Sequence, residues 1–271
     1  MPLSSLQREA LQLLAGARDP ESYVAGSTPL NVSSARYSSD IDIFHDRAER
    51  IAAQAEADSV LLSGAGFAVT WQRQTAFIHS ATIARGEEQT KLEWVGDSDF
   101  CFFPAIRDPL FGYCLHPVDL AINKLFAAVG RSEPRDTYGL MVFHETVAPL
   151  SVIVWAGVEK SPGFTPEGLV AEVRRNLMHS VSAWQEVDAD APLDPRDITI
   201  KVRAALDAAE AFAARMPTGK MGALFLDRDG RVVEPDPSLL SHYMEHRGQR
   251  RGHWPSSPEI TQAMFAKLYG R

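Results

Sequence analysis

The stretch GSTPLNVSSARYSSDIDIF, residues 26–44, contains the pattern that decides the fold. It opens with Gly26 and Ser27, which end a short apolar run and precede what we expect to be a helix through about Ala35. The first N–H groups of a helix have no partner within it, and the helix dipole is positive at that end. Gly26 and Ser27 are therefore candidates for binding a phosphate, although an ordinary turn with a helix cap would use the same residues.

The same stretch ends in Asp40-Ile-Asp42-Ile-Phe, whose alternation of acidic and apolar residues indicates a strand. Side chains two apart on a strand share a face, so Asp40 and Asp42 place two carboxylates side by side. Two such charges repel each other unless a cation joins them, and Mg²⁺ commonly takes one or two carboxylates together with substrate phosphates. The pair is a candidate metal site. The alternative is a turn acid and a strand-edge acid without a ligand.

A third carboxylate can join this pair from a later strand. Three segments at short spacing, 67–71, 75–83 and 90–95, are rich in strand-forming residues and predict an antiparallel meander. In the last segment the alternation puts Lys91 and Glu93 on one face. If that strand lies beside the strand of the two aspartates, Glu93 is a third metal ligand. Otherwise it is a solvated residue of an edge strand.

The pattern changes to helices after residue 116. We expect helices over residues 117–130, 136–145, 149–160, 166–181, 195–216, 237–246 and 258–269, with a strand at 222–226 and a hairpin turn at 227–230. The prediction is an α+β chain, with a mixed sheet and its helices in a domain over residues 1–116 and a mainly helical domain over residues 117–271.

The composition predicts an ordinary globular protein. With 271 residues, 45% of them hydrophobic and 23% charged, the chain is long enough for one large domain or two modest ones. The net charge of −8 argues against sequence-blind coating of nucleic acids, which needs a basic surface, but leaves local RNA contact open.

No run approaches the roughly 20 apolar residues that span a bilayer, and the N-terminus has no apolar signal-peptide core. We therefore expect no membrane partner. Cys101 and Cys114 form no disulfide framework, so we expect a reducing cytoplasm.

The glycine–serine turn, the Asp-x-Asp strand and a later carboxylate together resemble the DNA-polymerase-beta-like nucleotidyltransferase superfamily. A second cluster, PVDLAINKLFAAVGRSEPRDTY at residues 117–138, resembles the AbiEii/AbiGii-type nucleotidyltransferase toxin family, with its lysine helix and its R-D-x-Y segment. The resemblance covers about Tyr23 to Leu140 and implies a polymerase-beta-like mixed sheet followed by helices. One departure is Gly139, where the family usually has an aspartate.

The resemblance implies an Mg²⁺-dependent nucleotidyltransferase that moves NMP from an NTP to an acceptor. Asp40 and Asp42 would hold two Mg²⁺ ions, with Glu93 as a possible third ligand, and one ion would activate the attacking hydroxyl while the other binds the pyrophosphate. RNA, such as a tRNA 3′ end, is the expected acceptor. The family further implies a toxin paired with an antitoxin protein, or a phage-defence role. Nucleotide transfer to a small molecule or a protein, and a catalytically silent binding module of the same fold, are the alternatives.

Further residues would bind and orient the nucleotide. By resemblance, Gly26, Ser27 and Lys124 would contact the phosphates, and Asp136 would orient Lys124 or the acceptor hydroxyl. Arg36, four residues before the first aspartate, is close enough in sequence to reach a phosphate as well. Lys124 has a surface lysine on an amphipathic helix as its alternative, and Asp136 has a simple helix cap.

Two segments near the C-terminus have weaker patterns. His242-x-x-Glu245-His246 matches a zinc-protease motif, but too few ligands follow it, so we favour a solvated helix face. The basic loop Arg247–Trp254 suits contact with an RNA backbone and stacking of a base, unless its tryptophan packs inward.

Overall fold

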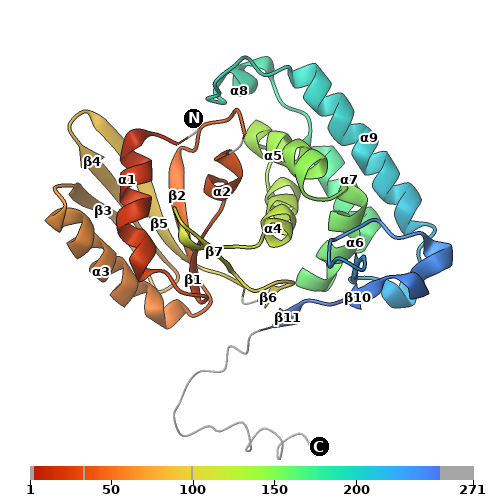
Figure 1. Cartoon of the computed structure of the whole chain (residues 1–271). Helices are drawn as coiled ribbons and strands as arrows, with labels where there is room; N and C mark the ends of the chain where they lie inside the picture. The colour runs from red at the N-terminus through yellow and green to blue at the C-terminus, as the bar shows by residue number, and fades with distance from the viewer. Residues whose placement is uncertain (1–2, 33, 99, 251–271) are drawn as a thin grey trace, which may run out of the picture.

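The computed structural model describes residues 3–32, 34–98 and 100–250, and its main feature is a seven-stranded mixed sheet (Figure 1). The strands stand in the order β3-β4-β5-β2-β1-β8-β7. Their bounds are Ser22–Ala25 (β1), Asp40–His45 (β2), Ala68–Gln74 (β3), Ile78–Arg85 (β4), Glu88–Gly96 (β5), Ile106–Asp108 (β7) and Gly112–Cys114 (β8). The strands β3, β4 and β5 form the predicted antiparallel meander. The predicted α+β architecture is confirmed.

Strand β2 lies in the middle of the sheet, and its two neighbours run in opposite directions. It pairs antiparallel with β1 and parallel with β5, and the parallel register places Asp42 opposite Glu93. Burial alternates along β2, because Ile41 and Ile43 are fully buried on one face while the two aspartates are half-buried on the other. The face that holds the aspartates can therefore contact a ligand, whereas the opposite face packs into the core and anchors the strand.

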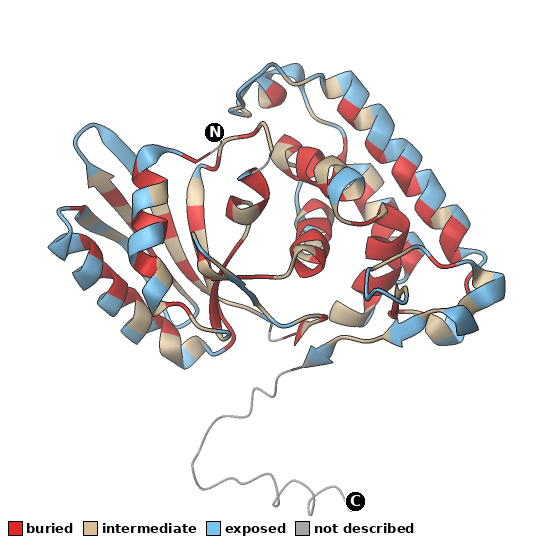
Figure 2. Cartoon of the chain, viewed as in Figure 1, coloured by how far each residue is buried: buried red, intermediate tan, exposed pale blue. Residues whose placement is uncertain are grey.

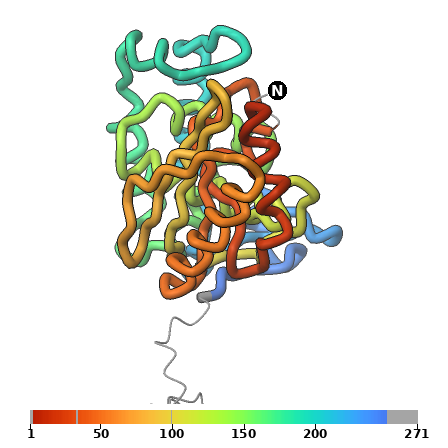
Figure 3. The backbone as a smooth tube through the Cα atoms, turned by 90° about the vertical axis from the view of Figure 1, so that its left-hand side faces the viewer, coloured from red at the N-terminus to blue at the C-terminus, as the bar shows by residue number. Residues whose placement is uncertain are grey.

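Two helices, α1 (Ser5–Leu14) and α3 (Ile51–Gly64), cover the anchoring face of the sheet. Helix α1 begins at a capping box in which the Ser4 hydroxyl accepts from the Gln7 N–H and the Gln7 side chain accepts from the Ser4 N–H. The apolar residues of both helices pack with β2, β4 and β5 in one cluster that includes the fully buried Trp94. Figure 3 shows this N-terminal half nearest the viewer, with the helical half behind it.

The C-terminal half is mainly helical, as predicted, and it lies against the other face of the sheet (Figure 1). Its α-helices are Pro117–Gly130 (α4), Pro134–Thr146 (α5), Leu150–Lys160 (α6), Pro166–Asn176 (α7), Val181–Gln185 (α8) and Pro195–Ala213 (α9). The remaining strands are Phe100–Cys101 (β6), Leu224–Leu226 (β9), Met244–His246 (β10) and Gln249–Arg250 (β11). The 3₁₀ helices are Ala15–Ala17 (η1), Ala48–Arg50 (η2), Thr218–Lys220 (η3) and Pro237–His242 (η4).

One hydrophobic cluster connects the helical half to the sheet. It joins residues of α4 to α7 and α9 with Tyr23 on β1 and with Phe100 and Phe102, which follow β5. Figure 2 shows these buried segments in red between the two halves. The helical half is therefore fixed to the sheet by a common core. The division into two domains at residues 116 and 117, where α4 begins, stays a prediction.

Helix α6 lies in the interior of the helical half. Every residue from Leu150 to Val158 is buried. No single helix within residues 3–32, 34–98 and 100–250 is long and apolar enough to cross a membrane. Helices α5 and α6, bent by 114° at their junction, meet the length and composition criterion only as a pair.

The predicted helix from Gly26 to about Ala35 is wrong in its length. Helix α2 covers only Thr28–Asn31, a single turn. The chain that follows pairs with a distant segment instead. Ala35 C=O accepts from the N–H of Asp190, and Tyr37 N–H donates to the C=O of Asp188. This tertiary contact joins segments about 150 positions apart in the sequence, so no local pattern records it.

The predicted helix over residues 237–246 is also wrong. The 3₁₀ helix η4 ends at His242, and β10 then pairs antiparallel with β9, so that Glu245 lies opposite Phe225. The two histidines of the zinc-like motif therefore do not share a helix face, and His246 Nε2 lies 2.6 Å from the carbonyl oxygen of Phe102. The predicted helix 258–269 lies outside the described residues.

The basic loop is described only over residues 247–250. There Arg247 is paired with Glu159 at 3.1 Å and with Glu245 at 3.0 Å, so its charge is used within the protein. Residues 251–254, including the tryptophan, lie outside the described residues. The predicted RNA contact of this loop stays a prediction.

A buried ion pair joins Arg18, which follows η1, to α3. Arg18 Nη2 lies 2.5 Å from Asp58 Oδ1, and the two side chains are 1% and 0% exposed. The indole N–H of Trp94 donates to the other carboxylate oxygen at 2.7 Å. Removing one partner of a buried pair leaves an uncompensated charge, whereas an exposed pair is screened by water.

We therefore predict that Asp58→Ala lowers the free energy of unfolding by about 3–5 kcal/mol in urea titrations. Arg47→Ala is the control, because its pair with Glu21 is partly exposed and should cost less than about 1 kcal/mol. Equal losses in the two variants would contradict the assignment of Arg18–Asp58 as the buried anchor.

Candidate active site

Three carboxylates converge on the open face of the sheet. Asp40 and Asp42 project from β2, and the parallel register with β5 brings Glu93 to the same position. Their ligand oxygens lie within 4.8 Å of one another. The structure thus brings together the predicted metal ligands, including the third one, which depended on β5 lying beside β2. Their roles in catalysis stay predictions.

The three carboxylates have more negative charge than the neighbouring lysines neutralise. Lys91 Nζ pairs with Glu93 Oε1 at 2.6 Å. Burial and the charges of Asp40 and Glu93 nevertheless raise the pKa of Asp42 to about 7, although Lys124 and Lys91 oppose the shift. Hard oxygen donors held this closely fit a divalent cation, which would replace the proton as the balancing charge. The residues present therefore fit Mg²⁺.

Gly26 is required where β1 turns beside this cluster. Its φ is +65°, and an added Cβ would lie only 1.9 Å from Asp42 Oδ2. The Asp42 carboxylate occupies the space of the missing side chain. Ser27 follows at the start of α2 and makes no side-chain cap. Because α2 is one turn long, phosphate binding here would rest on the Ser27 hydroxyl and the N–H groups of the turn, with little help from a helix dipole.

The two ends of the deciding stretch are held together by hydroxyl groups. Thr28 Oγ1 donates to the C=O of Asp40 at 2.9 Å and lies 3.2 Å from Ser38 Oγ. Ser38 Oγ donates to the same carbonyl at 2.9 Å. These contacts keep the Gly26–Ser27 turn beside the carboxylates.

A second charged group lies opposite the three carboxylates, where α4 meets α5. Lys124 Nζ donates to Asp136 Oδ1 at 2.8 Å, and Arg131 Nε donates to Asp136 Oδ2 at 2.7 Å. Lys124 is only 8% exposed, so it is not the surface lysine of the alternative interpretation. Asp136 is not the helix cap either, because Glu133 occupies that position.

Burial and pairing act in opposite directions on these groups. Burial lowers the pKa of Lys124, although the Asp136 charge opposes the shift. Burial acts to raise the pKa of Asp136, but the hydrogen bond from Arg131 and the charge of Lys124 outweigh it, so the net shift is downward. Asp136 is therefore the acid that holds the two cations in place.

Gly139 provides space for the lysine. It lies one turn beyond Asp136 on α5, and an added Cβ would be 3.0 Å from Lys124 Cδ and 3.2 Å from Cε. An aspartate at this position would force the lysine stem to move. The departure from the family pattern therefore has a structural reason in this chain.

Helix α4 is fixed at its start by a buried acid. Asp119 accepts from the main-chain N–H groups of Phe102 and Phe103 at 2.7 and 3.0 Å. Burial raises the pKa of Asp119 to about 6, even though these two hydrogen bonds favour the ionised form. This contact ties α4, and with it Lys124, to the segment that follows β5.

The predicted residues surround one cavity of about 490 Å³, here called the carboxylate cavity. Six of them line it: Gly26, Ser27, Asp40, Asp42, Glu93 and Lys124. Asp136 does not line it but holds Lys124 and Arg131, which do. Arg131 and Arg135 are lining residues that the sequence interpretation did not select. The two arginines stand four residues apart, on either side of the start of α5, and Arg135 directly precedes Asp136. This arrangement was the available signal in the sequence.

Comparison with known proteins gives the fold a class. No protein-family model and no curated protein sequence matches the chain. Among solved structures, MenT4, a nucleotidyltransferase toxin from Mycobacterium tuberculosis H37Rv, is similar with a TM-score of 0.54 and 18% identity, over 79% of this chain and 83% of that one. The chain shares the fold of this nucleotidyltransferase. A candidate nucleotidyltransferase from H. pylori has a TM-score of 0.45 and 13% identity, over 78% of this chain and 94% of that one.

The likeness to MenT4 confirms the fold that the sequence predicted and leaves the finer assignment open. Membership of the AbiEii/AbiGii-type toxins stays a prediction. At this level of identity the likeness gives the fold alone, so the activity has to be argued from the side chains of the carboxylate cavity.

We predict that Gly26→Ala disrupts the carboxylate cavity more than backbone strain alone explains. Gly86 is the matched control, because its φ of +63° is nearly the same but nothing lies within 4 Å of an added Cβ. Both alanine variants should lose about 1 kcal/mol from the left-handed backbone. Only Gly26→Ala should weaken Mg²⁺ binding, measured by titration calorimetry. Equal Mg²⁺ affinities in the two variants would contradict the contact with Asp42.

Proposed function

We propose that this protein is a metal-dependent nucleotidyltransferase that moves NMP from an NTP to an acceptor hydroxyl. The observation that supports the proposal best is the meeting of Asp40, Asp42 and Glu93 within 4.8 Å, on the central strands of a nucleotidyltransferase fold. A structural role for this cluster is disfavoured, because three carboxylates that share a site destabilise it unless a cation is bound.

The three carboxylates would hold Mg²⁺. When bound, Mg²⁺ would activate the attacking hydroxyl and stabilise the charge on the departing pyrophosphate. In the reaction, a bond forms between the acceptor oxygen and the α-phosphorus, and the bond from that phosphorus to the pyrophosphate oxygen breaks. The hydroxyl proton passes to a carboxylate of the cluster. The contribution of the protein is therefore mostly positioning and electrostatic stabilisation, as is general for phosphoryl transfer.

The cations on α4 and beyond its end would bind the triphosphate. Lys124 and Arg131 line the carboxylate cavity opposite the acids, and Asp136 orients both of them. Lysine acts on phosphates as a point charge, whereas an arginine can bind two oxygens at once. The Gly26–Ser27 turn would contribute N–H groups and a hydroxyl to the same phosphates.

RNA, such as a tRNA 3′ end, is the acceptor we favour, and a toxin role with a protein antitoxin is the biological role we favour. MenT4, which has the same fold, is described as a nucleotidyltransferase toxin. The order of the Asp-x-Asp, lysine-helix and R-D-x-Y segments also supports this choice over transfer to a small molecule or a protein.

We predict that Asp42→Asn lowers nucleotide transfer at least about a hundredfold, the scale of losing one essential electrostatic group. The same substitution removes like-charge repulsion, so the metal-free variant should melt at the same temperature as the wild type or higher. The assay incubates the protein with Mg²⁺, each labelled NTP and total RNA, with protein and small-molecule fractions counted separately. Asp229→Asn, in a turn with a side chain 71% exposed, is the control and should remain active.

Each fraction of this assay decides one question. Label that appears only on RNA and depends on Asp42 supports the proposal, and growth arrest on expression of the wild type but not Asp42→Asn supports the toxin role. Asp42-dependent label on protein or small molecules would overturn the RNA acceptor alone. Absence of label in all fractions, in a protein that binds NTP and Mg²⁺, would establish the silent binding module.

A further inference from the structure

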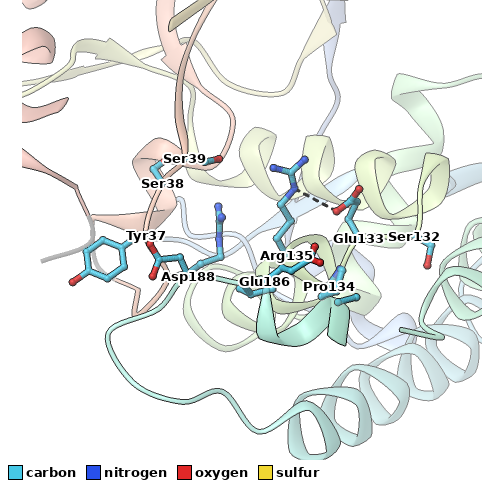
Figure 4. A pocket seen from close by; sticks show the side chains of 12 residues that line it. Tyr37, Ser38, Ser39, Ser132, Glu133, Pro134, Arg135, Glu186 and Asp188 are labelled. Carbon is cyan, nitrogen blue, oxygen red and sulfur yellow. Dashed lines mark ion pairs between the residues drawn. The ribbon is translucent and has the colours of Figure 1, made fainter. Parts of the chain in front are cut away.

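A second cavity of about 490 Å³ adjoins the carboxylate cavity and contains two arginines (Figure 4). Its lining includes Arg36, Ser38 and Ser39 from the segment before β2, and Ser132, Glu133 and Arg135 at the start of α5. We call it the Arg36–Arg135 cavity. Because Arg135 lines both cavities and Ser39 directly precedes Asp40, a ligand in this cavity would lie next to the carboxylates.

Arg36 is a buried charge without a partner. Only 5% of the residue is exposed, and among the described residues its guanidinium makes no hydrogen bond or ion pair. Burial lowers the pKa of Arg36, and the charge of Asp40 only partly opposes that shift. A buried guanidinium that lacks a partner destabilises the folded state. The position of Arg36 at a cavity wall therefore indicates that an anionic ligand pairs with it.

Arg135, in the first turn of α5, is the second cation of this cavity. The Nε of Arg135 is buried and has no hydrogen-bond partner among the described residues, and its nearest acid, Glu133, is at 3.9 Å. Figure 4 shows the Arg135 side chain extending from the helix start, with its ion pair to Glu133 drawn as a dashed line. The Arg135 guanidinium, whose Nε makes no hydrogen bond within the described ranges and whose contact with Glu133 is long, is suited to phosphate oxygens.

The charge of the whole lining limits which anion fits. Three acids, Glu133, Glu186 and Asp188, line the same cavity and outnumber the two arginines. A triphosphate, with several negative charges, would be repelled by these acids. A phosphodiester has a single negative charge that two guanidinium groups can bind. The acids and the serine hydroxyls remain available for the hydroxyls and amino groups of a nucleoside.

We propose that Arg36 and Arg135 bind the 3′-terminal phosphodiester of a polynucleotide acceptor and so place its terminal hydroxyl beside Asp40 and Asp42. The inference rests on the proposed nucleotidyl transfer and adds the residues that bind the acceptor. In-line transfer puts the attacking oxygen and the leaving pyrophosphate on opposite sides of the α-phosphorus. A separate phosphate site that shares a wall with the carboxylate cavity meets that requirement, because Lys124 and Arg131 already serve the triphosphate.

The test measures binding by the full-length protein without turnover. The probe is a 5′-fluorescent RNA tetranucleotide, used with its natural 3′-terminal linkage and with an uncharged methylphosphonate at that linkage. Fluorescence anisotropy gives the Kd of each probe for the wild type, Arg36→Gln, Arg36→Lys and the control Arg107→Gln. Arg107 is exposed and lines neither cavity. The Kd for a fluorescent NTP with Mg²⁺ is measured on the same samples, and melting curves establish that each variant folds.

We expect the wild type and Arg107→Gln to bind the natural probe about tenfold more tightly than the methylphosphonate probe, as for one lost charge-assisted contact. Arg36→Gln should bind both probes equally weakly, Arg36→Lys should recover part of the difference, and NTP binding should not change. Weakened NTP binding with unchanged RNA binding would assign the cavity to the triphosphate and overturn the proposal. Equal binding of the two probes by the wild type would overturn it as well.

The outcomes separate this inference from the proposed function. Transfer of NMP to a protein or a small molecule, with no RNA binding, would overturn the phosphodiester site and leave nucleotidyl transfer standing. Charge-dependent RNA binding by a protein that transfers no nucleotide would support the site and overturn the proposed activity.

Discussion

The central constraint of this structure is that three mutually repelling carboxylates are held side by side. The position of β2 between β1 and β5 forces Asp40, Asp42 and Glu93 together, and the Gly26 turn closes over the Asp42 carboxylate. The apolar side of β2, packed against α1 and α3, holds the strand in this unfavourable electrostatic position. Apolar packing on one face of β2 stabilises the fold, whereas the repelling carboxylates on the other face destabilise it. This combination is typical of a functional site.

The positive charges around the cluster are themselves held by acids. Asp136 binds Lys124 and Arg131 on one side of the carboxylate cavity, so these cations remain in place when no ligand is present. Arg36, in the adjoining cavity, is paired with no acid among the residues that the structure describes. Groups that must be ready for the nucleotide are therefore preorganised by the protein, whereas the acceptor site depends on its ligand to complete it.

Local periodicity was sufficient to predict the parts of the site that lie within one element. The alternation of residues 40–44 placed both aspartates on one face, and the helix pattern after Pro117 placed Lys124. Pairings between distant segments were not predictable in this way. Residues 35–37, where a helix was predicted, pair with residues 188–190 instead, and β9–β10 pairing replaces the helix predicted for residues 237–246. The carboxylate of Glu93 lies between these cases, because its face was evident but its neighbouring strand was not.

The most direct test of the central claim is a crystal structure of the protein with Mn²⁺ and a non-hydrolysable NTP analogue, with the metal located by its anomalous signal. The account predicts Mn²⁺ about 2 Å from oxygens of both Asp40 and Asp42, and a triphosphate that contacts Lys124. Nucleotide bound elsewhere, or nucleotide in the carboxylate cavity with no metal on these aspartates, would contradict it.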